Sequence, residues 1–130
     1  MIFLETSFII NYFVPKAQNH QKANEIFETI ENKDKAISEM VVYETLTVLR
    51  KLKQNETLIK KAYNNIANSK NITVFEDILY YEKALDYTLN KNTIGFFDNL
   101  SYIVMKNNNI KTIASFDPDF DIFTDIERIH

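Results

Sequence analysis

The sequence predicts an α/β fold in which helices cover both faces of a central parallel sheet, giving three layers, α/β/α. Short apolar runs typical of buried strands alternate with longer segments of helical periodicity, and neither a linker nor an internal repeat interrupts this alternation. With 130 residues, 45% of them hydrophobic, the chain can bury a core without metal or disulfide support. We therefore expect residues 1–130 to form a single domain.

The first strand is expected at Met1–Leu4, where large apolar residues follow one another as they do in the middle strand of a parallel sheet. The strand ends at Glu5. Thr6 and Ser7 are good helix caps, so we expect the apolar run Phe8–Phe13 that follows to be helical. Glu5 thus lies at the carboxyl end of a strand, the edge of open parallel sheets where ligands bind.

Apolar periodicity and turn residues define the rest of the chain. Further helices are expected at Gln18–Ile30, Glu39–Lys53, Leu58–Ala67, Ile78–Leu89 and Gly95–Asn107, and strands at Ala36–Ser38, Ile72–Phe75 and Lys111–Ala114. The 78–89 helix has apolar residues around much of its circumference, which predicts that it is largely buried. Asn90–Thr93 is expected to be a loop, and Asn107–Asn109 a turn, because Asn tolerates the left-handed conformation. The acidic tail from Ser115 is expected to be turn-like, with an edge strand at Glu127–Ile129.

Composition excludes several classes of function. The chain has no Cys and two His, so disulfides, zinc–thiolate sites, cysteine nucleophiles and Ser-His-Asp triads are not expected. Its single glycine, Gly95, rules out glycine-rich phosphate-binding loops. The apolar amino terminus is too short to span a bilayer and has no basic region before it, so we expect a cytoplasmic protein without a membrane partner. A net charge of −3 does not indicate broad nucleic-acid affinity, although it allows a local contact.

Four acids fall near the carboxyl edge of the predicted sheet. They are Glu5 after the first strand, Glu44 in the helix after the second, Asp98 in the first turn of a later helix, and Asp117 after the fourth strand. Clustered carboxylates repel one another and are costly to bury without a cation. Oxygen ligands without His or Cys suit Mg²⁺ or Mn²⁺ rather than zinc. Such a site activates water for phosphodiester hydrolysis, often with two ions about 3.5–4 Å apart.

Each acid also has a purely structural interpretation. Asp98 can be a partner of the helix dipole, and Glu44 can lie at the wet edge of its helix. Asp117 and Asp121 are ordinary residues for a turn-rich tail. Taken singly, none of these acids indicates a function, but the arrival of four at one edge favours a common site.

Hydroxyl and tyrosine side chains near this edge are interpreted in the same way. The hydroxyl residues are more often caps and turn formers than ligands, although they can orient a water molecule at a metal; they are Thr6, Ser7 and Ser115. Three tyrosines are interpreted as core and boundary aromatics rather than base-stacking platforms; they are Tyr80, Tyr81 and Tyr87.

Four segments resemble the PIN-domain ribonucleases, in particular the VapC-type toxins of prokaryotic VapBC toxin–antitoxin pairs. These segments are Met1–Ile10, the helix with Glu44, Gly95–Tyr102 and Ile113–Asp121. The resemblance extends from end to end, and the first and last segments are the more specific. It implies a PIN-like fold and an Mg²⁺- or Mn²⁺-dependent endoribonuclease. It also implies a homodimer and a small antitoxin whose tail occupies the acidic groove.

The resemblance also implies roles for individual residues. By matching motif, Glu44, Asp98 and Asp117 would be metal ligands or would anchor metal-bound water, with Asp121 as an accessory residue. The hydroxyls that match positions near the metal are those of Thr6, Ser7 and Ser115.

The chain departs from the family pattern at Glu5, where an Asp is expected. The extra methylene displaces the carboxylate by about 1 Å or more, whereas a productive metal geometry tolerates about 0.5 Å. Misplacement of this size can cost about a hundredfold in rate. Glu can still bind Mg²⁺, so we expect metal binding to be retained.

The leading interpretation is a metal-dependent endoribonuclease that hydrolyses RNA phosphodiester bonds through a metal-activated water. Its catalytic residues would be Glu5, Glu44, Asp98 and Asp117, and its metal ligands Glu5, Asp98 and Asp117. The alternative is a PIN-like RNA- or protein-binding module that is catalytically weakened because Glu5 replaces Asp. A phosphoacceptor receiver domain fits less well, because it requires an acidic pair after the first strand, where Glu5 stands alone.

Overall fold

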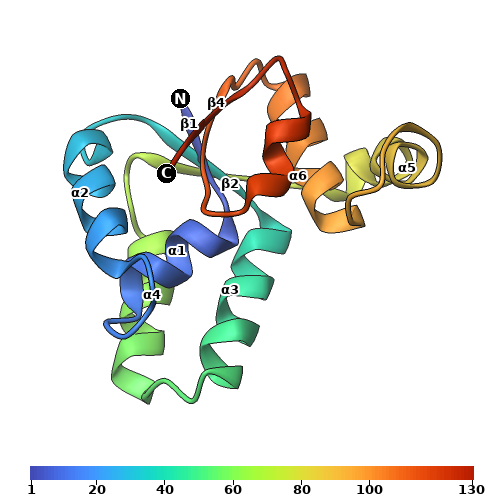
Figure 1. Cartoon of the computed structure of the whole chain (residues 1–130). Coiled ribbons are helices and arrows are strands. Elements are labelled where there is room, and N and C mark those ends of the chain that lie inside the picture. The colour runs from blue at the N-terminus through green and yellow to red at the C-terminus, as the bar shows by residue number, and fades with distance from the viewer.

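A fully parallel five-stranded sheet with the order β3-β2-β1-β4-β5 forms the centre of the molecule (Figure 1). The structure is a computed structural model that describes all residues from Met1 to His130. The strands are β1 Ile2–Leu4, β2 Lys35–Ser38, β3 Ile72–Phe75, β4 Thr112–Ala114 and β5 Glu127–Ile129. All three residues of β1 are buried, which confirms the prediction of a central first strand.

Helices cover both faces of this sheet. The α-helices are α1 Thr6–Phe13, α2 His20–Ile30, α3 Glu39–Lys51, α4 Glu56–Ala67, α5 Tyr81–Asp86 and α6 Phe96–Asn107. The connections from β1 to β2 and from β2 to β3 run toward one edge of the sheet, and the connection from β3 to β4 runs back. Because such crossovers are right-handed, opposite directions place helices on opposite faces. Contacts of α1 with α2 and α3, of α3 with α4, and of α5 with α6 agree with this arrangement, and the predicted α/β/α fold is confirmed.

The helix α6 is the most deeply buried of these elements. Its residues from Asn99 to Met105 are all buried, and its apolar side chains belong to a core cluster of 23 buried residues. A helix enclosed in this way has a fixed position relative to the sheet. The first turn of α6, which carries Asp98, is therefore held by the core behind it.

The segment from Ile78 to Lys91 differs from the sequence prediction. It was expected to be one largely buried helix followed by a loop, but it consists of the 3₁₀-helix η1 Ile78–Tyr80, α5 and the π-helix η2 Tyr87–Lys91. Ala84 is its only buried residue, while Leu79 is 78% exposed and Leu89 70%. The prediction of burial is wrong because this segment packs on α6 along one side and leaves its remaining apolar side chains in solvent.

The predicted turn at Asn107–Asn109 is confirmed, since Asn109 has a φ of 55°. Lys53, which follows α3, has a φ of 56° and was not signalled by a glycine or an asparagine. The tail contains the 3₁₀-helix η3 Pro118–Ile122 and the predicted edge strand β5. None of the helices combines the length and the hydropathy that a membrane span needs.

Candidate active site

The chain changes direction across the sheet at β1, which lies between β2 and β4. In open parallel sheets, ligands bind in the crevice beyond the carboxyl ends of the strands at such a switch point. A cleft of about 420 Å³ lies there, and we call it the acidic cleft. Its lining consists of Glu5, Glu44, Gly95, Phe96, Phe97, Asp98 and Asp117. The fold thus brings together the four acids that the sequence singles out.

Glu5 is anchored through one of its two carboxylate oxygens. Its Oε2 accepts hydrogen bonds from the backbone N–H of Ser7 at 2.9 Å, from the hydroxyl of Ser7, and from the hydroxyl of Ser115 at 2.8 Å. No protein donor bonds to Oε1, although Glu5 is only 7% exposed. Burial raises the pKa of Glu5 above its ordinary value, the hydrogen bonds from Ser7 and Ser115 oppose this shift, and the charge of Glu44 adds to it.

The two serines also join β1 to the segment after β4. The hydroxyl of Ser7 accepts a hydrogen bond from the backbone N–H of Phe116 at 2.9 Å, and that of Ser115 accepts one from Asp117 at 3.0 Å. These bonds fix the backbone that carries Asp117. Thr6 differs from the two serines, because its buried hydroxyl has no hydrogen-bond partner. None of these three hydroxyl residues is part of the lining of the acidic cleft.

Asp98 has a strongly perturbed environment. Burial and the neighbouring carboxylates of Asp117, Glu5, Asp119 and Glu44, in that order, raise the pKa of Asp98 to about 7. The ion pairs of the structure join other residues, so none of the four cleft acids has a Lys or Arg partner. A role as a helix-dipole partner does not explain this crowding, since that role needs only one acid.

Glu44 enters the cleft from α3, and the start of this helix is fixed by a residue distant in sequence. Ser38, at the cap position, makes no side-chain capping bond. Instead, the buried Asp77 accepts a hydrogen bond from the backbone N–H of Met40 at 2.6 Å and another from the hydroxyl of Tyr81 at 2.9 Å. No sequence pattern indicated this cap, because Asp77 follows β3 whereas α3 follows β2.

Asp119 is a further candidate that the sequence interpretation missed. Asp98, Asp117 and Asp119 each offer a carboxylate oxygen, and these oxygens lie within 4.8 Å of one another. Asp117 caps η3 by accepting a hydrogen bond from the backbone N–H of Asp119 at 2.9 Å. The sequence Asp117-Pro118-Asp119 could have indicated this, because a turn capped by the first acid brings the two carboxylates to the same side of the turn.

Asp121 lies apart from this trio of acids. Its two oxygens accept hydrogen bonds from Nε and a terminal nitrogen of Arg128, both at 2.8 Å. The bond from Arg128 lowers the pKa of Asp121. Its carboxylate therefore already has a counter-ion, and its accessory role stays a prediction.

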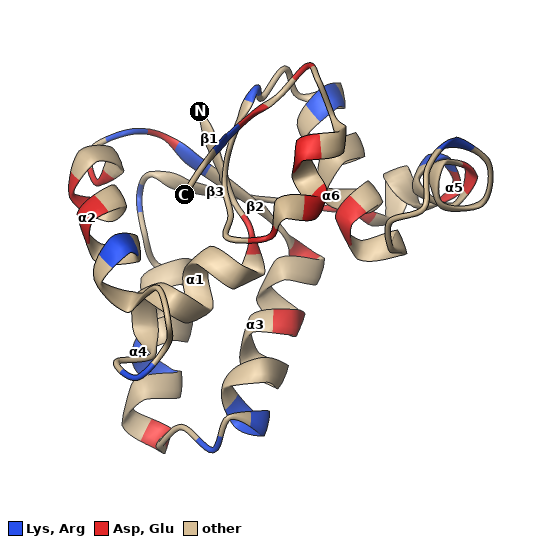
Figure 2. Cartoon of the chain, in the orientation of Figure 1, with Lys and Arg blue, Asp and Glu red and all other residues tan.

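Basic residues do not line the acidic cleft, although Arg128 lies near Asp117 and donates to the carbonyl of Ser115 at 3.2 Å. Figure 2 shows acidic segments at the upper part of α3, the start of α6 and the tail, whereas the basic residues of α3 lie at the opposite end of that helix. None of the residues that line the cleft is Lys or Arg. The acids of the cleft thus have no ion-pair partner within the protein, which is the charge arrangement of a cation-binding site.

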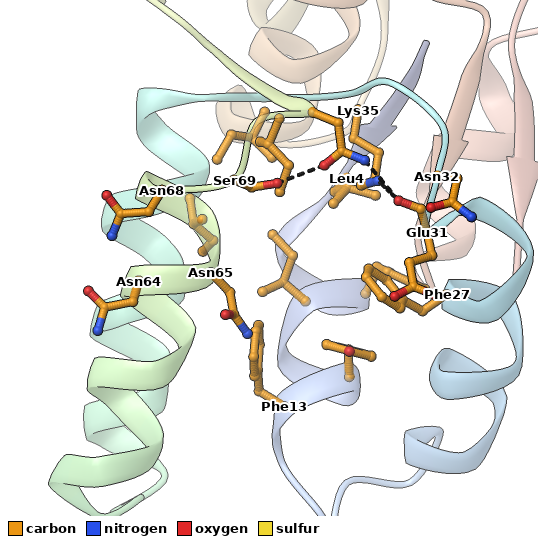
Figure 3. A pocket seen from close by; sticks show the side chains of 17 residues that line it. Leu4, Phe13, Phe27, Glu31, Asn32, Lys35, Asn64, Asn65, Asn68 and Ser69 are labelled. Atoms are coloured by element: carbon orange, nitrogen blue, oxygen red, sulfur yellow. Dashed lines mark hydrogen bonds between the residues drawn. The ribbon is translucent and has the colours of Figure 1, made fainter.

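A larger cavity of about 610 Å³ lies elsewhere, between α1, α2 and α4 (Figure 3). Its wall includes Phe13, Phe27 and several asparagines. The buried ammonium group of Lys35 closes one side by donating to the carbonyls of Ile30, Glu31 and Lys33 at 3.1, 2.8 and 2.8 Å. None of the four acids lines this cavity.

Together these features define an α/β/α domain with an oxygen-only acidic cleft at the switch point of its sheet. The profile of the PIN domain family matches residues 2–125, and the chain belongs to this family. The sequence has no match among the curated proteins.

Three solved structures share the fold. VapC20 of Mycobacterium tuberculosis, described as a Sarcin-Ricin loop cleaving toxin, has a TM-score of 0.86 and 23% identity, with 98% of each chain covered. FitAcB of Neisseria gonorrhoeae has a TM-score of 0.69 and 17% identity, covering 100% of this chain and 97% of its own. VapBC2 of Rickettsia felis, bound to a DNA fragment from its promoter, has a TM-score of 0.66 and 17% identity, covering 99% and 98%.

Proposed function

We propose that the protein is a metal-dependent endoribonuclease that hydrolyses phosphodiester bonds of RNA and acts as the toxin of a toxin–antitoxin pair. The observation that carries this proposal is the convergence of Glu5, Glu44, Asp98 and Asp117 on one cleft without a protein counter-ion. Membership of the PIN domain family supports it, as does the likeness of the fold to VapC20, a Sarcin-Ricin loop cleaving toxin.

The donor set fits Mg²⁺ or Mn²⁺. Carboxylate oxygens of Asp98, Asp117 and Asp119 lie within 4.8 Å of one another, and Glu5 keeps one oxygen free of protein donors. Hard divalent cations prefer such oxygen ligands. Glu5, Asp98 and Asp117 would hold the ion, and Glu44 would complete the acidic lining. A bound ion supplies a Lewis acid that activates water and stabilises the charge that develops on phosphate.

The serines and the core keep these acids in place. Ser7 and Ser115 fix the direction of the Glu5 carboxylate, and the buried part of α6 fixes Asp98. Preorganisation of this kind spares the reacting groups a reorganisation cost during the reaction. The chain thus positions the oxygen ligands and leaves their carboxylates without an ion pair to Lys or Arg.

Two protein partners belong to this proposal. The likeness to VapBC2 and the resemblance to VapC-type toxins support a small antitoxin that binds the protein in the cytoplasm. Exposed aliphatic side chains on η1, α5 and η2 support a homodimer.

The experiment that tests the proposal compares the natural protein with Asp98→Asn on a pool of structured RNAs in the presence of Mn²⁺. We expect Asp98→Asn to abolish cleavage and to weaken Mn²⁺ binding measured by calorimetry, because a ligand oxygen is replaced by an amide. Asp86→Asn is the matched control, since Asp86 is exposed on α5 and should leave both properties unchanged. Retained Mn²⁺-dependent cleavage in Asp98→Asn would overturn the proposal.

The second candidate function is the weakened binding module, and the position of Glu5 is the observation that bears on it. The serine contacts of Oε2 accommodate the longer side chain, so we expect the natural protein to cleave RNA and Glu5→Asp to retain cleavage. An inactive natural protein that still binds Mn²⁺, together with an active Glu5→Asp variant, would establish the weakened module instead.

A further inference from the structure

Aromatic rings border the acidic cleft on one side. Phe96 and Phe97 are part of its lining, and their ring centroids lie 6.3 Å apart. Phe96 also contacts Tyr81 edge-on, with centroids 5.9 Å apart and an interplanar angle of 73°. We call Tyr81, Phe96 and Phe97 the aromatic rim. Phe97 is 53% exposed and Tyr81 40%, so ring surface of this rim faces solvent beside the carboxylates.

Exposed aromatic side chains are concentrated at this place. The aromatic residues with the largest exposure are Tyr43, Tyr63, Tyr81 and Phe97. Phe97 and Tyr43 directly precede the cleft acids Asp98 and Glu44 in the sequence. Neither Tyr43 nor Tyr63 is part of the lining of the cleft. Single exposed aromatics are ordinary on protein surfaces, but a contiguous group beside a polar cleft marks a binding surface.

The charge of the cleft decides what this surface can bind. No Lys or Arg lines the cleft, so the bound divalent ion, and not a row of basic side chains, would meet the RNA phosphate there. Part of the affinity for RNA must then come from contacts that need no charge. Stacking of an unpaired base on an aromatic ring supplies such a contact, and it is the common way in which proteins hold single-stranded loops.

The rim is also well placed for this contact. Phe97 lies in the first turn of α6, whose next residues are buried in the core, so its position is set by a rigid element. Because this backbone is already ordered, stacking of a base costs only the remaining freedom of the side chain. Asp98 follows Phe97 directly, which puts the ring beside the carboxylates.

We propose that the aromatic rim stacks against an unpaired base next to the scissile phosphodiester bond and thereby positions the RNA in the acidic cleft. This inference rests on the proposed function for the position of the scissile bond. Tyr81, interpreted from the sequence as a core or boundary aromatic, is 40% exposed and contacts the cleft residue Phe96, and the inference adds a stacking role to it.

The test measures binding rather than cleavage. The Asp98→Asn protein is mixed, with Mg²⁺, with an RNA hairpin that carries a fluorescent purine analogue in its loop, and the fluorescence and the Kd are recorded. Stacking quenches the analogue. We expect quenching in this parent, loss of quenching with about 10- to 100-fold weaker binding after Phe97→Leu, and recovery of both after Phe97→Tyr.

Two controls make the result specific. Tyr63→Leu removes an aromatic ring of similar exposure from α4 and should leave quenching and Kd unchanged. The same sequence paired in a duplex should give no quenching. Size-exclusion chromatography of every variant shows whether Phe97 affects association of the protein with itself.

Several outcomes would overturn the inference. It fails if the parent shows no quenching, if Phe97→Leu binds the hairpin as the parent does, or if Phe97→Leu changes the oligomeric state, because the rim would then be a protein interface. The two proposals can fail separately. If the natural protein has no nuclease activity but shows Phe97-dependent quenching, the proposed function fails and the stacking surface stands. If the protein is an active nuclease whose RNA binding does not depend on Phe97, only the role of the aromatic rim fails.

Discussion

The surroundings of an aspartate determine its pKa, as Asp98 in the acidic cleft and Asp121 outside it show. Asp121 has a full counter-ion in Arg128 and a lowered pKa. Asp98 has burial and four acidic neighbours, and its pKa is raised to about 7. The two aspartates are alike in the sequence, and only their contacts distinguish a paired surface acid from one that lacks a cation.

The raised pKa of Asp98 gives a pH dependence of stability in the metal-free protein. An acid whose pKa is higher in the folded than in the unfolded state binds more protons when folded, so its favourable contribution is present at low pH and is lost as pH rises. The loss takes place between pH 3.8, the ordinary pKa of an aspartate, and about pH 7, the pKa of Asp98 in the folded protein. Asp98 is only partly buried, so we expect a loss of about 1–2 kcal/mol after allowance for solvent screening.

Urea unfolding of the natural protein and of Asp98→Asn in chelator, across this pH window, measures the effect. The uncharged Asn has no such titration, so the difference in the free energy of unfolding between the two proteins should change with pH. Mg²⁺ added at the upper end of the window should stabilise the natural protein more than the variant. Parallel pH curves for both proteins would show that Asp98 is not perturbed.

At the scale of elements, the apolar patterns of the sequence predicted the strands and helices. They did not predict features that depend on contacts between elements distant in sequence. The strand β1 and the acids Glu5 and Asp117 followed from apolar runs and from the rule that parallel strands end at one edge. The exposure of α5 could not be predicted in this way, because apolar periodicity does not show whether another element packs on the far side of a helix. The cap of α3 by Asp77 was missed for the same reason, since the carboxylate that accepts the hydrogen bond from Met40 lies on another strand connection.

A buried amide network connects η2, the loop before α6 and α6 itself. Asn99 is fully buried, and its Nδ2 donates to Asn92 Oδ1 at 3.0 Å, to Thr88 Oγ1 at 3.1 Å and to the carbonyl of Ile94 at 3.3 Å. Its Oδ1 accepts a bond from Asn92 Nδ2 at 2.6 Å. These bonds fix the loop that leads into the cleft residues of α6.

We expect Asn99→Ala to lower the free energy of unfolding by about 2–3 kcal/mol, because it leaves buried polar partners without a hydrogen bond. Urea denaturation measures the change. Asn107→Ala, at the exposed end of the same helix, is the control and should alter stability by about 0.5 kcal/mol or less. Equal effects of the two substitutions would show that the buried network contributes nothing specific.

The whole molecule has two surfaces of opposite character. One is the acidic cleft at the carboxyl edge of the sheet, and the other is the apolar surface of η1, α5 and η2, which lie at one side of the molecule in Figure 1. The exposed aliphatic residues of this second surface are Ile78, Leu79, Leu85 and Leu89, with exposures of 67, 78, 49 and 70%. A contiguous apolar surface of this kind is typical of a protein interface.

We expect this surface to join two copies of the chain, because burying its aliphatic side chains removes apolar area from water at about 25 cal/mol per Å². Light scattering should then give a mass of twice 15.3 kDa for the natural protein. The double substitution Leu85→Lys and Leu89→Lys places two charges in the contact and should give the single-chain mass with an unchanged circular dichroism spectrum. Leu52→Lys, at a residue 48% exposed beyond the end of α3, is the matched control and should stay dimeric. A natural protein that is monomeric at micromolar concentration, or a double variant that keeps the dimer mass, would contradict the assignment of this surface.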